Sequence, residues 1–234
     1  MANTRVHRSG STFQLLTAGP SVVTQSQSYE HDKIPLPLLR KQVSACTLEF
    51  LNEGETANGA DDEKKSHVVL RLAFKHTIMK ATPYAPPSTT GILISIDIHG
   101  NIPDSYNMGS KLVVKTLSYQ GPHQRALKSI DIPIAPGKTV KDFLIPTNLS
   151  KILPFTFVFD GNGYMGCRDF MSQFLRRLEN TEVITFSREE DSAAFYRHFN
   201  MRYGKEGMTW FNPVLRGDFP DNYSYIVLTD VIYH

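Results

Sequence analysis

Between residues 67 and 159, short apolar or alternating stretches are separated by clusters of Gly, Pro, Asn and Ser. Alternation with a period of two is typical of half-buried strands, and such clusters are typical of the turns between them. Little room is left for helices, which favours an antiparallel sandwich or barrel over parallel βαβ units. The expected strands span 68–74, 91–98, 111–117, 129–134, 141–145 and 154–159.

A helical spacing precedes these strands. Leu39, Val43, Cys46 and Phe50 recur at heptad-like intervals behind Pro37, a residue that is accepted in the first turn of a helix. The spacing predicts a short amphipathic helix within 37–51.

The pattern after residue 166 is mixed. Ser187 and Glu190 have the spacing of a capping box, which predicts a helix continuing through Phe199. Extended structure is expected at 183–186, 210–215 and 223–233. An earlier helix is predicted by residues that share one helical face, namely Phe170, Phe174, Leu175 and Leu178.

These patterns predict a mainly β fold with an α+β tail, in which a jelly-roll-like antiparallel core is followed by a helix-containing C-terminal region. Residues 1–30, rich in Ser, Thr and Gln, are expected to form a flexible arm. Residues 31–165 form the expected β-rich core domain, and 166–234 the α/β region. The polar, acidic segment 52–65 is expected to be an exposed loop.

Several protein classes do not fit the composition. No apolar run approaches the roughly 20 residues that span a bilayer, and the N-terminus lacks the apolar core of a secretory signal. Cytosolic synthesis is therefore expected. Cys46 and Cys167 are the two cysteines, and the eight histidines show no zinc-ligand spacing. We expect no disulfide framework and no metal.

Charge is distributed unevenly along the chain. Residues 49–63 carry six acidic side chains and no Lys or Arg, whereas 64–151 carry twelve Lys and Arg against four Asp, a net charge of +8. A positive field favours polyanionic partners such as nucleic acid or an anionic membrane surface. Dispersed charges of this kind are also compatible with an ordinary solvated surface.

Single-stranded nucleic acid requires cations for phosphates and aromatic faces for unstacked bases. Tyr84, Tyr106 and Tyr119 lie among the basic residues of the middle segment, and a period of two places Lys111 and Lys115 on one side of a strand. The candidate nucleic-acid-binding residues are Lys75, Lys80, Lys111, Lys115, Arg125 and Lys128.

The segment PYAPPSTTGILISID at 83–97 resembles the core signature of the thirty-kilodalton superfamily of plant-virus movement proteins. In that pattern a proline-containing turn leads through a glycine, here Gly91, into an apolar strand that carries an aspartate, here Asp97. LPFTFVF at 153–159 resembles the strand that closes the same core. His99 stands where members often carry a basic residue. Asp97 also has a structural interpretation, in which it accepts hydrogen bonds from the turn that follows.

The resemblance implies a non-enzymatic protein that binds single-stranded nucleic acid without sequence preference and carries a viral genome through plasmodesmata. It implies no cofactor and no catalytic centre. The implied partners are viral nucleoprotein or coat protein, plasmodesmal or membrane-associated host proteins, and further copies of the chain. The implied location is the host cytoplasm, at membranes or plasmodesmata, without a transmembrane helix.

The stretch FVFDGNGYMGCRDF at 157–170 contains Gly161, Gly163 and Gly166 at the G-x-G-x-x-G spacing of a dinucleotide-binding loop. The C-terminal part that begins with this stretch, about 80 residues, resembles the first half of a nucleotide-sugar short-chain dehydrogenase, and Arg188 would then meet a cofactor 2′-phosphate. Asp160 opposes this, because a carboxylate in that loop would repel the pyrophosphate. The sequence also ends before a Tyr-x-x-x-Lys pair. The competing interpretation is a sharp turn from strand to helix, with glycines at positive φ.

Two alternatives to a movement protein therefore stay open. A viral coat or matrix protein would present the same strand pattern and a loose N-terminal arm. An NAD(P)-binding protein without the catalytic half of a dehydrogenase would explain the glycine loop.

Overall fold

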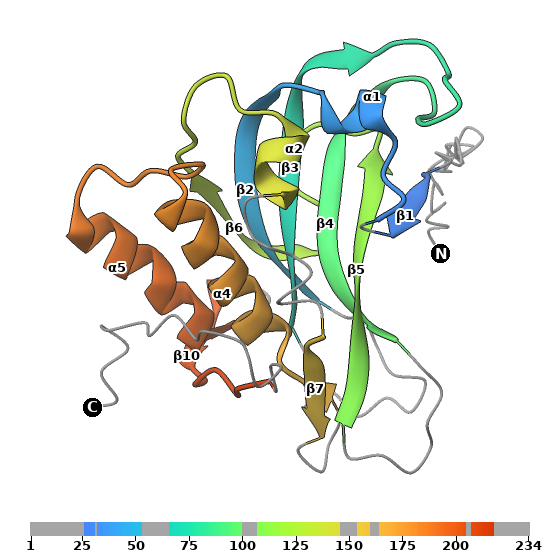
Figure 1. Ribbon diagram of the computed structural model, residues 1–234. Helices are drawn as coiled ribbons and strands as arrows, with labels where there is room; N and C mark the ends of the chain where they lie inside the picture. The colour runs from blue at the N-terminus through green and yellow to red at the C-terminus, as the bar shows by residue number, and fades with distance from the viewer. Residues whose placement is uncertain are drawn as a thin grey trace, which may run out of the picture.

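The strands expected in the middle of the chain form one antiparallel sheet in the computed structural model (Figure 1). Their order is β6-β2-β3-β4-β5-β7-β8, and β1 pairs with a further part of β5. The structure describes residues 26–30, 32–52, 66–99, 107–145, 154–159, 164–204 and 207–217. The strands of this sheet are β1 (Ser28–Glu30), β2 (Val43–Asn52), β3 (Ser66–Ile78), β4 (Thr89–His99), β5 (Asn107–Leu117), β6 (Ala126–Ile132), β7 (Thr156–Phe159) and β8 (Tyr164–Met165).

The two faces of the sheet have different surroundings. On the inner face, buried side chains such as Leu48, Leu70 and Ile94 belong to the main hydrophobic core. The outer face, on the opposite side, carries a smaller apolar cluster of Leu51, Val69, Leu93 and Leu117. Strand alternation places polar side chains beside this cluster. Those discussed below are Thr47, Glu49, Arg71, Asp97, Lys111 and Lys115.

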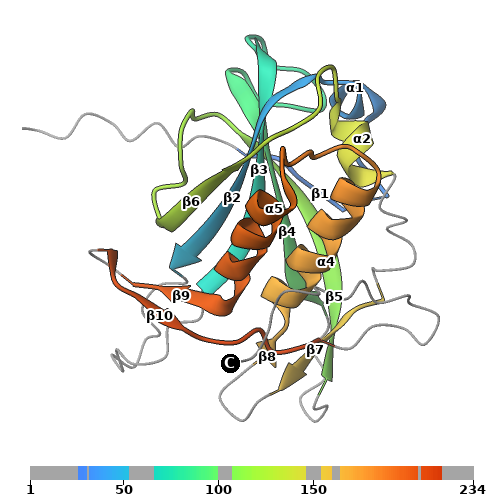
Figure 2. The ribbon, with the colours of Figure 1, turned by 90° about the vertical axis from the view of Figure 1, so that its left-hand side faces the viewer.

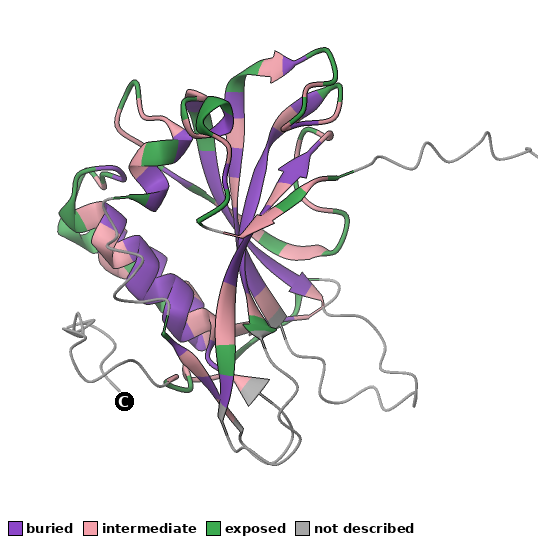
Figure 3. Ribbon diagram, turned by 45° about the vertical axis from the view of Figure 1, so that its right-hand side comes forward, coloured by how far each residue is buried: buried purple, intermediate pink, exposed green. Residues whose placement is uncertain are grey.

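Helices cover the inner face (Figure 2). α4 (Cys167–Asn180) and α5 (Glu189–Arg197) pack there, and a 3-10 turn, η1 (His198–Asn200), follows α5. The predicted apolar stripe of α4 is confirmed, because all four of its residues are fully buried, and Figure 3 shows α4 as mostly buried. Beyond η1, β9 (Met201–Tyr203) and β10 (Thr209–Phe211) form a separate two-stranded hairpin.

The predicted helix within 37–51 is wrong. Only α1 (Leu36–Leu39) is helical, and β2 occupies most of the remainder. Residues 46–51 are all buried, because β2 lies between two strands and has packed side chains on both faces. Because both faces of β2 are buried, its apolar and polar residues do not alternate. The spacing of its apolar residues instead resembles the heptad spacing of a helix.

The predicted strand at 141–145 is also wrong. The segment belongs to α2 (Val140–Leu144), which begins after Thr139. The Asp142 carboxylate accepts hydrogen bonds from the backbone N–H and the hydroxyl of Thr139, both at 2.7 Å. This capping contact favours a helix start that the apolar run alone does not reveal.

Two further predictions for the tail need correction. α5 exists, but no side-chain hydrogen bond caps it, so the capping box of Ser187 and Glu190 does not form. The expected strand at 183–186 is reduced to a single bridge between Ile134 and Ile184.

The predicted fold class is confirmed as mainly antiparallel β with helices toward the C-terminus. The sheet is open and not closed into a barrel, and its inner face packs against helices. The end of the predicted N-terminal arm, Ser28–Glu30, is a strand. Predictions for 1–25, 53–65 and 223–233 fall outside the described residues. Within the described ranges, every helix is too short or too polar to cross a membrane.

Candidate functional site

The predicted cations lie in three different parts of the sheet. Lys111 and Lys115 do share one face of β5, as the period of two predicts, but the others are on different strands. Lys75 and Lys80 lie on and just beyond β3, Arg125 and Lys128 lie at the edge strand β6, and Lys111 and Lys115 lie on the outer face of β5.

The positive charge of Lys111 is already paired. Its Nζ forms an ion pair with Glu30 of β1, and Lys33 also reaches the Glu30 carboxylate at 2.6 Å. These two hydrogen-bonded lysines lower the pKa of Glu30 to about 2. The pair joins β1 to β5, so Lys111 contributes to the sheet and is not an uncompensated cation on β5.

Asp97 belongs to a polar cluster on the outer face. The Ser95 hydroxyl donates to its carboxylate at 3.0 Å, His67 Nε2 lies 3.9 Å from the same oxygen, and Lys111 is its cross-strand neighbour on β5. The predicted contact with the turn at 100–106 concerns residues outside the described ranges. The observed contacts assign Asp97 a role in cross-strand pairing.

Gly91 is required by a close approach of two strands. It lies between Ala73 of β3 and Leu117 of β5, and a Cβ at this position would come within 2.3 Å of the Leu72 carbonyl oxygen. Any side chain there would push β4 away from β3. The close packing of β4 against β3 therefore explains why a glycine occupies this position of the sequence signature.

The glycine stretch continues from a strand into a hairpin before it reaches a helix. β7 pairs antiparallel with β8, so the chain reverses direction between Phe159 and Tyr164. Gly161 and Gly163 lie outside the described residues, and Gly166 has φ 133° directly before α4. The turn interpretation is confirmed for Gly166. In a dinucleotide loop, by contrast, the strand leads through the glycines directly into the helix.

Arg188, the residue considered for a cofactor phosphate, has a local partner instead. Its guanidinium donates two hydrogen bonds to Asp191, at 2.7 and 3.1 Å. Both side chains are exposed at the start of α5. This pairing provides no support for a cofactor site.

A surface that combines aromatic and basic side chains lies around the β9–β10 hairpin. Arg202 and Trp210 are opposite each other in the hairpin, and the guanidinium carbon lies 5.4 Å from the centre of the indole ring. Trp210 is 42% exposed and Phe211 59% exposed. As neighbours on β10, Trp210 and Phe211 point to opposite faces of the hairpin. We call this region the hairpin edge and define it by Lys128, Arg197, His198, Arg202, Trp210 and Phe211.

His198 interacts with the hairpin and with the remaining cations of the hairpin edge. Its Nδ1 shares a hydrogen bond with the Tyr203 hydroxyl, and partial burial lowers the pKa of His198, with further lowering by Lys128 and Arg197. Both cations therefore act electrostatically on the imidazole. Within the part of the chain that the structure describes, no carboxylate forms an ion pair with Lys128 or Arg197.

A partly buried arginine holds the hairpin against the helices. Arg168, in the first turn of α4, donates to the carbonyl oxygens of Phe199 and Asn212 at 2.9 and 2.8 Å. Longer contacts reach the carbonyls of Met201 and Pro213. Burial lowers the pKa of Arg168. Both ends of the hairpin are thus fixed to one side chain.

The hairpin edge has the chemistry expected of a binding surface. Cations can meet phosphates, and exposed rings can stack on bases. Within the described residues, no group of three or more His, Cys, Asp or Glu side chains is placed to hold a metal. Sequence reasoning missed this surface, although two short extended runs separated by Gly204 and Gly207 are a hairpin signal.

Comparison with known proteins gives one match. Residues 85–220 match the model of a family described as Domain of unknown function (DUF7770). No curated protein and no solved structure matches the chain. The matched range includes Gly91, Asp97, both helices of the inner layer and the β9–β10 hairpin. It covers more than half of the sequence, and the chain therefore belongs to this family.

Proposed function

We propose that this protein is a non-enzymatic binding protein for single-stranded nucleic acid and that the hairpin edge is its binding surface. The observation that carries the proposal is a short hairpin that presents two exposed rings, Trp210 and Phe211, with Arg202 over the first. Lys128 and Arg197 act on His198, which is hydrogen-bonded to Tyr203 of the same hairpin. Stacking on aromatic rings and contacts to phosphates together bind single strands with little dependence on sequence.

The anchoring of the hairpin supports this assignment. A binding surface loses less affinity to ordering when its side chains are already held in place. Arg168 fixes the backbone on both sides of the hairpin, and Arg202 lies over the Trp210 ring. The rings are therefore presented on a fixed backbone.

The cellular role that we attach to this proposal is movement of a viral genome between plant cells through plasmodesmata. Its support is the sequence resemblance at 83–97 and 153–159. Binding of the genome, of coat protein and of membrane-associated host proteins would then occur in the host cytoplasm.

The direct test is fluorescence anisotropy with a labelled oligouridylate at several salt concentrations. Trp210→Ala should weaken binding by roughly 5- to 150-fold, because stacking of one base contributes about 1–3 kcal/mol. Lys75 is an exposed lysine on β3, and Lys75→Ala is the control, which should leave the dissociation constant within about twofold of the unaltered protein.

Charge reversal separates the two candidate surfaces. The double variant Lys128→Glu with Arg197→Glu should weaken binding and reduce the salt dependence. Lys111→Glu with Lys115→Glu should have the smaller effect, since Lys111 is paired with Glu30. A larger effect of the β5 variant would move the binding surface to β5, and affinity that does not depend on salt would refute the proposal.

A further inference from the structure

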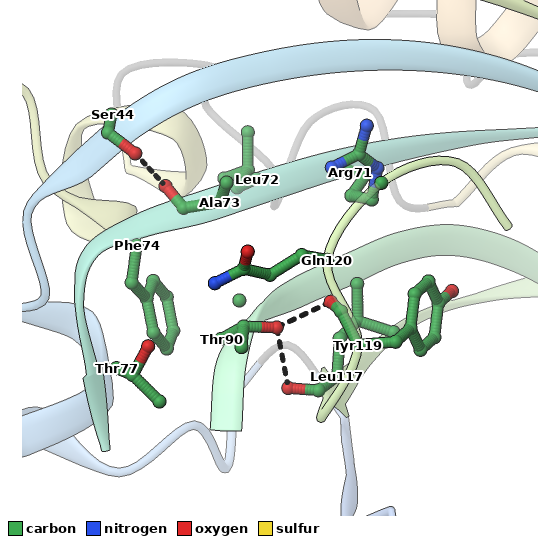
Figure 4. Close-up of a pocket in the computed structure, with 12 residues that line it drawn as sticks. Ser44, Arg71, Leu72, Ala73, Phe74, Thr77, Thr90, Leu117, Tyr119 and Gln120 are labelled. Atoms are coloured by element: carbon green, nitrogen blue, oxygen red, sulfur yellow. Dashed lines mark hydrogen bonds between the residues drawn. The ribbon is translucent and has the colours of Figure 1, made fainter. Parts of the chain in front are cut away.

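A cavity opens on the outer face, away from the hairpin edge. It has a volume of about 230 Å³ and lies between β3, β4, the start of β2 and the segment that follows β5 (Figure 4). Ligand sites for drug-sized molecules typically measure about 300–1,000 Å³, so this cavity suits a smaller molecule. Its lining includes Arg71, Ala73, Thr77, Thr90, Tyr119 and Gln120.

The cavity forms where β3 and β4 separate and where the residues that line them have small side chains. The pairing of β3 with β4 is regular as far as Ala73 and Gly91 and resumes only at Ile78 and Thr89. Gly91 and Ala73 have little or no side chain to fill the space at this point. A side chain at Gly91 would clash with the Leu72 carbonyl oxygen. The hollow is thus a result of the strand geometry itself.

Hydrogen bonds hold the wall of the cavity in place. The Thr90 hydroxyl donates to the carbonyl oxygens of Tyr119 at 2.6 Å and of Leu117 at 3.4 Å, as the dashed lines in Figure 4 show. The exposed Gln120 also lines the cavity and carries a side-chain amide (Figure 4). A fixed wall that carries an amide offers a donor and an acceptor to one small molecule.

The charge at the cavity is balanced. Arg71 Nε donates to the fully buried carboxylate of Glu49 at 2.6 Å, and Arg71 Nη2 donates to Thr47 at 3.1 Å. The Glu49 carboxylate balances the charge of the guanidinium, so the ion pair offers directed N–H groups without a net positive charge. This favours a neutral polar ligand over an anion.

A buried hydroxyl beside this pair is left without a partner. Among the described residues, none forms a hydrogen bond with Tyr119 Oη, and burial raises the pKa of Tyr119 to about 12, with Glu49 as the next contribution. In Figure 4 this hydroxyl points away from the hollow, and it is closed off from solvent, so a ligand in the cavity does not reach it. The features that face the hollow are therefore the Gln120 amide and the paired Arg71 guanidinium, which favour a small ligand rich in hydroxyl groups.

We propose that the outer-face cavity binds a neutral, polyhydroxylated molecule of monosaccharide size. The site is independent of nucleic-acid binding, since none of its lining residues belongs to the hairpin edge.

The test uses the full chain and saturation-transfer NMR with glucose, galactose, mannose and N-acetylglucosamine, followed by titration calorimetry for any sugar that binds. Gln120→Ala should weaken the binding by about three- to tenfold, the loss expected for one hydrogen bond. Ala73→Leu, which fills the hollow, should abolish it. Gln124→Ala, an exposed glutamine beyond the cavity, is the control and should leave the affinity unchanged.

Glucuronate distinguishes a neutral ligand from an anionic one and should bind more weakly than glucose. Tighter binding of glucuronate would overturn the assignment of a neutral ligand. Absence of a signal for all four sugars, or affinity unaffected by both Gln120→Ala and Ala73→Leu, would overturn the site. Thermal melting of each variant shows that it is folded before binding is measured.

Discussion

Glu49 has a fully buried side chain, although it lies on the outer face of the sheet, opposite the face on which α4 and α5 pack. Its two oxygens accept hydrogen bonds from Arg71 and from the backbone N–H of His123. A buried charge is tolerated only when it is paired and hydrogen-bonded in this way. The ion pair is therefore one of the most sensitive points of the outer face.

Breaking this pair from one side should be strongly destabilising. Arg71→Leu leaves the Glu49 carboxylate buried without its cation, and we expect a loss of about 3–5 kcal/mol in the free energy of unfolding. The measurement is urea denaturation followed by circular dichroism. The double variant Glu49→Leu with Arg71→Leu should recover most of the loss, and equal stability of the single and double variants would contradict this account.

At the scale of elements, the sequence predicts the strands and helices whose apolar residues recur at a clear period. β3, β4 and β5 were expected because their apolar residues alternate or are β-branched, and α4 was expected from one apolar stripe. β2 and α2 were not predicted correctly. β2 is buried on both faces, and α2 has only five residues, so its nature depends on the Thr139–Asp142 contact and on packing.

The contact between β3 and β4 can be tested at Gly91. Gly91→Ala places a Cβ about 2.3 Å from the Leu72 carbonyl oxygen, and the strands must separate to admit it. Forcing a methyl group into a packed site typically costs about 1–3 kcal/mol. Thermal and urea unfolding should show this loss, whereas Lys75→Ala on the exposed side of β3 should change stability by less than about 0.5 kcal/mol.

At the scale of the whole molecule, the candidate site depends on parts that are far apart in sequence. Lys128 comes from the sheet, Arg197 and His198 from the end of α5, and Trp210 from the hairpin. The requirement for cations and aromatic rings could be predicted from the sequence, but their location could not. The predicted basic residues of 64–151 lie at β3, β5 and β6, and Lys128 is the one of them that belongs to the hairpin edge, while the aromatic partners lie in the net acidic tail.

The position of His198 within this assembly predicts a pH dependence. Burial and two nearby cations lower its pKa in the folded protein below the ordinary value of 6.5. The stability gained from the neutral imidazole is therefore complete above pH 6.5 and is lost as the pH falls through the lowered pKa. Urea midpoints measured across this range should fall more steeply for the unaltered protein than for His198→Asn. Parallel curves would show that His198 makes no such contribution.

The way in which Arg168 holds the hairpin has a consequence for divergence within the family. Its four hydrogen bonds to described residues all go to carbonyl oxygens, which every amino acid possesses. Substitutions at positions such as Trp210 and Phe211 can therefore change what the surface recognises without releasing the backbone that presents it. Relatives that retain an arginine at this position are expected to keep the hairpin in place while its exposed side chains evolve towards different ligands.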